Sequence, residues 1–279
     1  MKHLLSIRDL SADDLNWILA ASEQPAQRLL QDKGVALYFE KPSSRTRNSM
    51  ELATAQLGGH PVYIQPAELG IGERESVADV TRTLACYHAI VAARVFDHGL
   101  LEQMSAVNAA PVLNLLSGTN HPLQALADLL TIKQLLGRLE GAKVAFIGEA
   151  NNVSRSLAEA CALVGAEFRI ASPEGYGFDD ALQDPAEAVE GADIVYTDVW
   201  VSMGAEESDE RRAAFEPYQV DEALMARTPN AWFMHCLPAR RGEEVTAPVI
   251  DGPRSAVWRQ AENRMHTARG AMLWLLEKD

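Results

Sequence analysis

Cysteine is scarce in this chain, where Cys86, Cys161 and Cys236 are the only three among 279 residues. An odd, widely spaced set does not suit a disulfide framework, and it indicates a reducing compartment such as the cytoplasm. No apolar run approaches the roughly 18 residues that a membrane-spanning helix needs. The first residues, Met1–Leu5 followed by several aspartates, do not have the pattern of a signal peptide. We therefore expect a cytoplasmic protein that does not enter a membrane.

Positive charge is also in short supply, because 25 Lys and Arg residues stand against 39 Asp and Glu, for a net charge of −14. A surface this acidic repels nucleic acids and anionic membranes, so neither is an expected partner. Arginines that gather in one short segment are therefore more informative here than they would be in a basic protein.

Short apolar runs alternate with helical patterns along the chain, at a length that suits two domains. Continuous apolar strands separated by helices are typical of parallel sheets covered on both faces, so we predict an α/β fold with two doubly wound parallel-sheet domains joined by helices. The strand at 144–147 ends in Gly148 but lacks the G-x-G-x-x-G of dinucleotide sites, and we expect no cofactor. The helical patterns include 123–136, 154–163 and 260–277. The expected strands are Val35–Phe39, Val62–Ile64, Ala89–Ala93, Val112–Leu115, Val144–Ile147, Phe168–Ala171, Ile194–Asp198 and Trp232–Met234.

Hydroxyl and guanidinium groups follow the first expected strand, in the segment Ser43-Ser44-Arg45-Thr46-Arg47, where a helical pattern begins. The first N–H groups of a helix lack intrahelical partners, and its N-terminus carries about half a positive charge, so it attracts a phosphate or carboxylate. Arginine adds paired donors that are always charged. A simple serine cap with solvated arginines explains the segment equally well when it is taken alone.

Arg94 and His121 stand at other expected strand ends. Arg94 ends the run 89–93, and His121 lies in the loop between a strand and the helix that begins near Pro122. Ligands of open parallel sheets bind at the carboxyl ends of the strands, which makes both residues candidates for a site. A surface salt bridge for Arg94, and a helix cap or a packing role for His121, remain open alternatives.

Two segments of the second half have similar positions. Asp198 ends a strand and is followed by Ser202 and a glycine, a combination that suits recognition of an ammonium group. The tetrapeptide 235–238, His-Cys-Leu-Pro, places a cysteine beside a histidine, which suggests a thiolate nucleophile, a metal pair or an inert buried cysteine. No second Cys/His pair stands at ligand spacing, so we expect no metal site.

Together these segments resemble the ornithine carbamoyltransferases, in order and over essentially the whole chain. The Ser-Arg-Thr and His-Pro-x-Gln segments mark transcarbamylases in general, whereas the Ser-Met-Gly segment points to ornithine rather than aspartate. The seven collinear segments are Ser-Ser-Arg-Thr-Arg (43–47), Arg94, His-Pro-Leu-Gln (121–124), Asn-Asn (151–152), Asp-Val-Trp-Val-Ser-Met-Gly (198–204), His-Cys-Leu-Pro (235–238) and Ala-Glu-Asn-Arg-Met-His (261–266).

The resemblance implies an enzyme of arginine biosynthesis, a homotrimer that transfers the carbamoyl group of carbamoyl phosphate to the δ-amine of L-ornithine, giving L-citrulline and phosphate. Residues 1–130, with a carboxyl-terminal helix at 261–279 that returns to them, would bind carbamoyl phosphate, and 139–258 would bind ornithine. The implied carbamoyl phosphate-binding residues are Ser43, Ser44, Arg45, Thr46, Arg94, His121, Gln124, Cys236, Leu237 and Arg264. The implied ornithine-binding residues are Asn152, Asp198, Ser202 and Met203, and the implied catalytic residues are Arg45, Thr46, Arg94, His121 and Cys236.

The implied reaction starts when the neutral δ-amine attacks the carbamoyl carbon and forms a tetrahedral oxyanion, after which phosphate leaves. Thr46, Arg94 and His121 would supply donors where the negative charge develops, and one such donor is typically worth about 3–4 kcal/mol. Cys236 would orient the amine rather than attack, because the reaction needs no covalent enzyme intermediate.

Three features depart from the family pattern. Gly70 stands where the family often has Gln or His, so a phosphate donor to a neighbouring subunit would be missing unless Arg74 substitutes. Arg240 stands where the family often has His. The short segment 172–190 predicts that the second sheet lacks one peripheral strand.

Several alternatives stay open at this stage. The nearest is a transcarbamylase for putrescine or N-acetylornithine. Asp198, Ser202 and Met203 argue against it, because these residues suit recognition of a free α-amino group. A catabolic enzyme would run the same chemistry in the phosphorolytic direction. A non-catalytic protein that binds carbamoyl phosphate or an amino acid would carry the same site residues without turnover.

Overall fold

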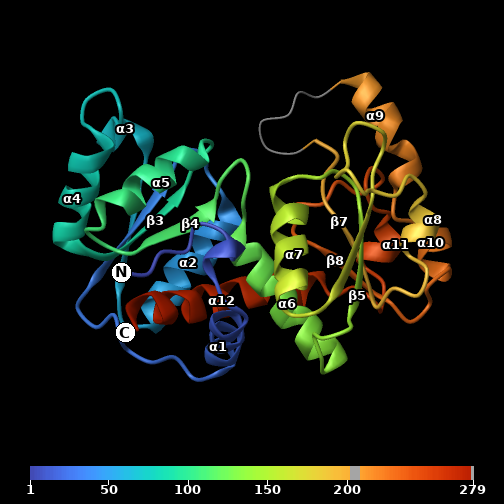
Figure 1. Cartoon of the computed structure of the whole chain (residues 1–279), viewed down its shortest axis with the longest axis horizontal. Helices are drawn as coiled ribbons and strands as arrows, with labels where there is room; N and C mark the ends of the chain where they lie inside the picture. The colour runs from blue at the N-terminus through green and yellow to red at the C-terminus, as the bar shows by residue number, and fades with distance from the viewer. Residues whose placement is uncertain (202–207, 278–279) are drawn as a thin grey trace. The chain divides into compact units, whose positions relative to one another are not determined.

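The computed structural model describes residues 1–201 and 208–277, which fold into two compact units (Figure 1). The first unit comprises residues 1–127 and the chain from 262 onward, and the second comprises residues 128–261. Each unit contains a four-stranded sheet in which every neighbouring pair of strands is parallel. The predicted α/β fold with two parallel-sheet domains is confirmed.

The first sheet has the strand order β2-β1-β3-β4. Its strands are β1 (Gly34–Phe39), β2 (His60–Ile64), β3 (His88–Arg94) and β4 (Val112–Leu116). The helices of this unit are η1 (Ile7–Asp9), α1 (Ala12–Glu23), α2 (Ser44–Gln56), α3 (Pro66–Leu69), α4 (Val77–Tyr87) and α5 (His98–Val107). β1 is buried except at Gly34, and the middle residues 90–93 of β3 are buried, as expected for a parallel sheet covered on both faces. This burial holds the carboxyl ends of both strands in place, where α2 follows β1 and Arg94 ends β3.

The apolar side chains of α4 and α5 pack on one face of this sheet. Val80 and Leu84 of α4 and Met104 of α5 belong to the same buried cluster as Val91 and Ala93 of β3. A fully buried aliphatic side chain stabilises the fold by about 1.5–3 kcal/mol. This cluster holds β3 in its place in the sheet. The strand ends at Arg94, where its register against β4 shifts.

The second sheet has the strand order β6-β5-β7-β8. Its strands are β5 (Lys143–Ile147), β6 (Glu167–Ala171), β7 (Ile194–Thr197) and β8 (Trp232–His235). The helices of this unit are α7 (Asn152–Leu163), α8 (Pro185–Ala188), α9 (Asp209–Phe215), η2 (Glu216–Tyr218), α10 (Glu222–Ala226) and α11 (Ala247–Ile250). Between β6 and β7 the chain forms only the short α8 and an isolated bridge from Ala171 to Leu182, as the brevity of 172–190 predicts.

Two longer helices connect the units along the chain, α6 (Pro122–Leu136) and α12 (Val257–Leu276). The carboxyl-terminal part of α12 belongs to the first unit, where it lies against α1 (Figure 1). The Trp274 indole donates to the Asp14 carboxylate (2.8 Å), and Arg269 donates to the Ser22 carbonyl (2.9 Å). At Gly270 a Cβ atom would lie 2.6 Å from the Ile18 carbonyl oxygen, so only glycine permits this close crossing. The predicted return of the last helix to the first domain is confirmed.

All eight predicted strands are present, with ends that differ by one or two residues. Helix α7 begins at Asn152, two residues earlier than the helical pattern suggests, because the Asn151 side chain caps it by accepting from the N–H groups of Val153 and Ser154. In the described parts of the chain, no helix is both long enough and apolar enough to cross a membrane.

Candidate active site

Ser43 caps α2 at the carboxyl end of β1. Its hydroxyl oxygen accepts from the Thr46 N–H (3.4 Å), and the hydroxyl donates to Thr46 Oγ1 (3.1 Å). Thr46 is buried, whereas Ser44 and Arg45 in the first turn are exposed. The capping interpretation of this segment is therefore correct for Ser43. It leaves the exposed first turn able to meet an anion at the positive end of the helix.

Arg47 faces a different set of neighbours from Arg45. Its Nε donates to the Glu51 carboxylate (2.7 Å), and its guanidinium lies 4.0 Å from the centre of the Tyr63 ring. An ion pair one helical turn away and a cation–π contact account for this side chain without a ligand. The two arginines of the motif therefore have different surroundings.

Arg94 brings a second guanidinium to the start of α2. Its Nη1 donates to Thr46 Oγ1 at 3.5 Å. Burial, followed by repulsion from the Arg45 charge, lowers the pKa of Arg94 from 12.5 to about 10. The group still carries its charge at neutral pH, so the charges of Arg45 and Arg94 lie near each other at the N-terminus of α2, in an otherwise acidic protein. Such an arrangement suits a dianion such as phosphate.

His121, Gln124 and Arg264 form a buried polar cluster at the start of α6. Arg264, from the part of α12 that belongs to the same unit, donates through Nη1 to the Gln124 side-chain oxygen (2.6 Å) and lies 3.3 Å from His121 Nε2. Because a guanidinium has donors only, Nε2 must be the accepting nitrogen, and the imidazole is neutral with its proton on Nδ1. Burial, then the charges of Arg264 and Arg94, lowers the pKa of His121 well below 6.5.

The loop before His121 is held by a buried asparagine that the sequence reasoning did not single out. Asn114, in the middle of β4, donates through Nδ2 to the carbonyls of Leu5 (2.8 Å) and Asn120 (3.3 Å). The Ser117 hydroxyl oxygen accepts from the Asn120 N–H (3.2 Å). Asn114 is fully buried, and the sequence signal that could have identified it is a single polar residue inside the otherwise apolar run 112–116.

In the second unit, Asp198 lies just beyond the end of β7 and is 8% exposed. Its Oδ2 accepts from Asn151 Nδ2 (2.9 Å), and its Oδ1 accepts from the Val199 N–H (2.8 Å) and the Cys236 thiol (3.0 Å). The structure therefore brings together Asp198 and Cys236, which lie 38 residues apart in the sequence.

Four residues were expected to bind ornithine, and the structure describes two of them. Asn152 is the half-buried first residue of α7, directly after the capping Asn151. Ser202 and Met203 lie outside the described residues. The sequence reasoning gave no role to Asn151, whose amide joins the α7 cap to the Asp198 carboxylate.

The chain turns sharply after β8, and His235 controls that turn. Its Nδ1 accepts from the Leu237 N–H (2.8 Å), so its proton lies on Nε2, which donates to the Glu244 carboxylate (3.1 Å). Both side chains of this pair are fully buried. Leu237 adopts φ of 61°, a left-handed conformation that costs a non-glycine residue about 1–2 kcal/mol, and it is followed by a cis peptide bond to Pro238.

Asp198, His235 and Cys236 each offer a potential metal ligand, and these ligand atoms lie within 4.8 Å of one another. The hydrogen bonds of His235 do not suit that role, because the lone pair of Nδ1 meets the Leu237 N–H and Nε2 holds a proton directed at Glu244. The hydrogen bonds of these three residues suit stabilisation of the turn after β8, which carries Cys236, better than they suit a metal centre.

Comparison with known proteins assigns the chain to a family. Residues 2–134 match the family model for the carbamoyl-P binding domain of aspartate/ornithine carbamoyltransferase, and residues 140–275 match the model for its Asp/Orn binding domain. The ornithine carbamoyltransferase of Bacillus subtilis is 45% identical, over 99% of this chain and 94% of its own length. That of Thermus thermophilus is 48% identical, over 89% of this chain and 86% of its own length.

Solved structures agree with these sequence matches. The ornithine carbamoyltransferase structure from Pyrococcus furiosus superposes with a TM-score of 0.93 at 42% identity, covering 97% of this chain and 96% of the other. The structure from Thermus thermophilus gives a TM-score of 0.92 at 43% identity, covering 99% of both chains. On these matches in sequence and fold, the chain belongs to the aspartate/ornithine carbamoyltransferase family of enzymes.

Proposed function

We propose that the protein transfers the carbamoyl group of carbamoyl phosphate to the δ-amine of L-ornithine, giving L-citrulline and phosphate in arginine biosynthesis. The names of its relatives support ornithine as the acceptor, and the relative from Pyrococcus furiosus, 42% identical, is named anabolic. The observation that carries the proposal is the convergence of Arg45 and Arg94 on the capped start of α2, a cationic site suited to a phosphate group.

The first unit holds the residues proposed for carbamoyl phosphate. Ser43, Ser44, Arg45, Thr46 and Arg94 bind its phosphate at the start of α2. The neutral imidazole of His121 donates to the carbamoyl oxygen, Gln124 contacts the carbamoyl nitrogen, and Arg264 orients both side chains, consistent with its contacts to them. In the second unit, Cys236 and the Leu237 carbonyl complete the set of proposed contacts.

The second unit holds the residues proposed for ornithine. The Asp198 carboxylate pairs with the α-ammonium group, and Asn152, Ser202 and Met203 add further contacts. Cys236, whose thiol donates to Asp198, orients the δ-amine. The carboxylate is buried, which strengthens its attraction for a cation once water is excluded.

The reaction follows from bringing the two substrates together. The uncharged δ-amine attacks the carbamoyl carbon, a C–N bond forms, and the carbonyl oxygen becomes an oxyanion. Thr46, Arg94 and His121 donate to that oxygen, a type of contact worth about 3–4 kcal/mol per donor. The oxyanion then re-forms the carbonyl as the C–O bond to phosphate breaks, and the nitrogen loses one proton, which the leaving phosphate accepts. Positioning of the two substrates supplies much of the remaining rate enhancement, and no cofactor is needed.

Two departures from the family pattern concern single residues, Gly70 in the first unit and Arg240 in the second. Gly70 ends α3 with φ of 58°, a conformation that favours glycine. The Arg74 guanidinium donates to the Glu68 carbonyl (2.5 Å), so it would have to leave this contact before serving a phosphate in a neighbouring subunit of the proposed homotrimer. Arg240 forms a partly exposed pair with Glu243 (3.4 Å).

The test is citrulline formation by the purified protein from ornithine and carbamoyl phosphate. Arg45→Ala should reduce turnover by at least about a hundredfold, because it removes a charged phosphate contact. Arg47→Ala is the matched control on the same helix, and it should change turnover by no more than about threefold since Glu51 and Tyr63 already occupy its guanidinium.

Two results would oppose the proposal. Carbamoylation of putrescine or N-acetylornithine without citrulline formation would refute ornithine as the acceptor. Binding of carbamoyl phosphate without turnover of any amine would indicate a binding protein instead.

A further inference from the structure

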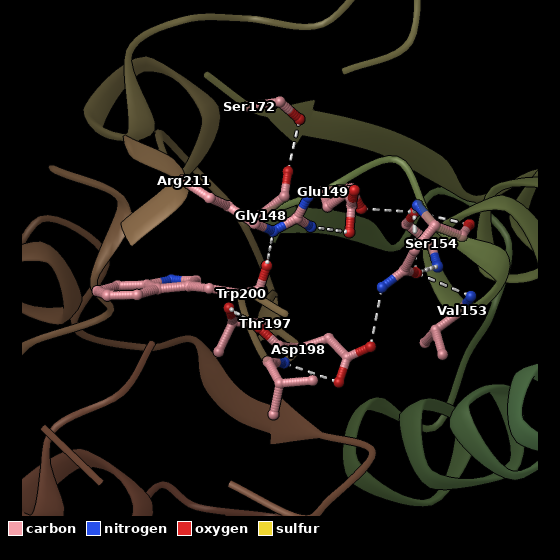
Figure 2. A network of polar contacts seen from close by, with 11 residues as sticks. Gly148, Glu149, Val153, Ser154, Ser172, Thr197, Asp198, Trp200 and Arg211 are labelled. Atoms are coloured by element: carbon pink, nitrogen blue, oxygen red, sulfur yellow. Dashed lines mark hydrogen bonds and ion pairs between the residues drawn. The ribbon is translucent and has the colours of Figure 1, made fainter. Parts of the chain in front are cut away.

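The second unit contains a nearly buried ion pair that the proposed reaction does not use, between Arg211 and Glu149. The Arg211 Nη2 and a Glu149 carboxylate oxygen lie 2.6 Å apart, with side-chain exposures of 10% and 18%. The Arg211 Nε donates to the Trp200 carbonyl at 2.6 Å. The guanidinium also lies over the rings of Tyr176 (5.0 Å) and Phe215 (5.3 Å). Figure 2 shows Arg211 between Glu149 and Trp200.

The two residues that Arg211 contacts, Trp200 and Glu149, are each connected to the carboxylate of Asp198. Trp200 lies two residues beyond Asp198 on the same strand end. Glu149 lies two residues before Asn151, whose Nδ2 donates to Asp198 Oδ2 (2.9 Å). Three hydrogen bonds and two short backbone segments therefore form a closed loop, here called the contact ring, through Arg211, Trp200, Asp198, Asn151 and Glu149. Figure 2 shows four of these residues, Arg211, Trp200, Asp198 and Glu149.

We propose that Arg211 and Glu149 are positioning residues of the ornithine half-site, which hold the Asp198 carboxylate in place through the contact ring. This inference rests on the proposed function, because it concerns the orientation of the group that receives the ornithine ammonium. Neither residue touches the substrate in this account. Each fixes one of the two backbone segments that carry Asp198 and its partner Asn151.

Arginine is specifically suited to the contact ring. Its planar fork holds two acceptors at once, with Nε on the Trp200 carbonyl and Nη2 on Glu149. A lysine would keep the charge but offers a single point donor on a flexible stem. Arg211→Lys should therefore release one side of the contact ring without leaving Glu149 as an unpaired buried charge.

The residues beside Glu149 and Arg211 help to design the test. The backbone next to Glu149 has further hydrogen bonds, and the residue next to Arg211 serves as a matched control. The Ser172 hydroxyl donates to the Gly148 carbonyl (2.5 Å), and the Ser154 hydroxyl donates to the Glu149 carbonyl (2.9 Å), so two further hydrogen bonds support the backbone segment that the Glu149 carboxylate also holds. Arg212, the next residue of α9, pairs with Glu243 (3.0 Å) and is 38% exposed.

The experiment measures steady-state kinetics of Arg211→Lys, Glu149→Gln and the control Arg212→Lys in the full-length enzyme. We expect Arg211→Lys to raise KM for ornithine by about tenfold, the usual effect of losing one charge-assisted hydrogen bond. Glu149→Gln, which keeps an acceptor oxygen, should raise it by about threefold to tenfold. KM for carbamoyl phosphate should stay within about twofold in both, and Arg212→Lys should leave both KM values unchanged.

The outcomes separate the inference from the function on which it rests. If the unmodified enzyme makes no citrulline, the proposed function fails. If it is active and both variants keep KM for ornithine within twofold, or lose kcat alone, the positioning role is refuted, because a purely structural role lowers the active fraction and leaves KM unchanged. Should Arg211→Lys not fold, Glu149→Gln decides by the same criterion, with Glu149→Asp as a second test of the same side of the contact ring.

Discussion

Removal of the Glu244 carboxylate is a direct test of how the turn after β8 is held. The carboxylate accepts two hydrogen bonds inside the second unit, from His235 Nε2–H (3.1 Å) and from the Arg240 N–H (2.6 Å). Since Glu244 and the His235 side chain are fully buried, no bulk water can replace the lost acceptor. In Glu244→Ala both donors lose their partner, and His235 no longer has a fixed ring orientation with which to accept from Leu237.

The magnitude follows from these two contacts. A hydrogen bond to a charged group contributes about 1.5–3 kcal/mol, and two such bonds to the Glu244 carboxylate are lost. We therefore expect Glu244→Ala to lower the free energy of unfolding by about 3–5 kcal/mol. Glu244→Gln keeps an oxygen for both donors and loses only the charge, so it should cost about 1–2 kcal/mol.

The assay is equilibrium urea unfolding followed by circular dichroism, at one protein concentration for all variants. Glu243→Ala is the matched control, because in the described part of the chain the carboxylate of this neighbour forms partly exposed pairs with Arg212 and Arg240, so its loss should cost less than about 1 kcal/mol. An effect of Glu244→Ala no larger than that of Glu243→Ala would refute the reasoning.

Three further predictions concern the first unit. The free energy of unfolding should fall as pH drops below 6.5, because His121 has a lowered pKa and stays unprotonated in the folded state, whereas it takes up a proton in the unfolded chain. In His121→Gln, the difference between the urea midpoints at pH 7.5 and pH 5.5 should be smaller. Inorganic phosphate at about a hundred times its Kd should stabilise the protein by about 2.7 kcal/mol, and a thermal melt of Arg94→Gln should show a smaller rise in Tm at the same phosphate concentration. Gly270→Ala should lower the free energy of unfolding by about 1–3 kcal/mol in urea, since its Cβ would lie 2.6 Å from the backbone carbonyl oxygen of Ile18; an unchanged midpoint would contradict the close crossing of α1 and α12.

The strands could be predicted because most of them are short, largely apolar runs between helical patterns. β1 and β3 read directly as Val35–Phe39 and Ala89–Ala93, and Arg94 and His121 lie at the ends of strands or just beyond them, as expected. The exact ends could not be read, since β7 ends at Thr197, before the aspartate that the strand prediction included.

The pairings within the site could not be predicted, because they join residues far apart in the sequence. Arg264 and Gln124 are separated by 140 residues, and Arg211 and Glu149 by 62. Asn151 and Asn152 are chemically identical in the sequence, and only the fold shows that the first caps α7 and contacts Asp198. Local patterns indicate where polar groups emerge from a sheet, whereas tertiary packing decides which of them meet.

The central claim is that one chain binds both carbamoyl phosphate and ornithine for transfer between them. Calorimetric titration with a bisubstrate analogue, in which ornithine is joined to a carbamoyl phosphonate, tests it directly because tight binding needs both half-sites at once. We expect one analogue per chain, bound far more tightly than inorganic phosphate or ornithine alone, and a large loss of affinity in Arg45→Ala. Binding no tighter than that of phosphate alone would contradict the claim.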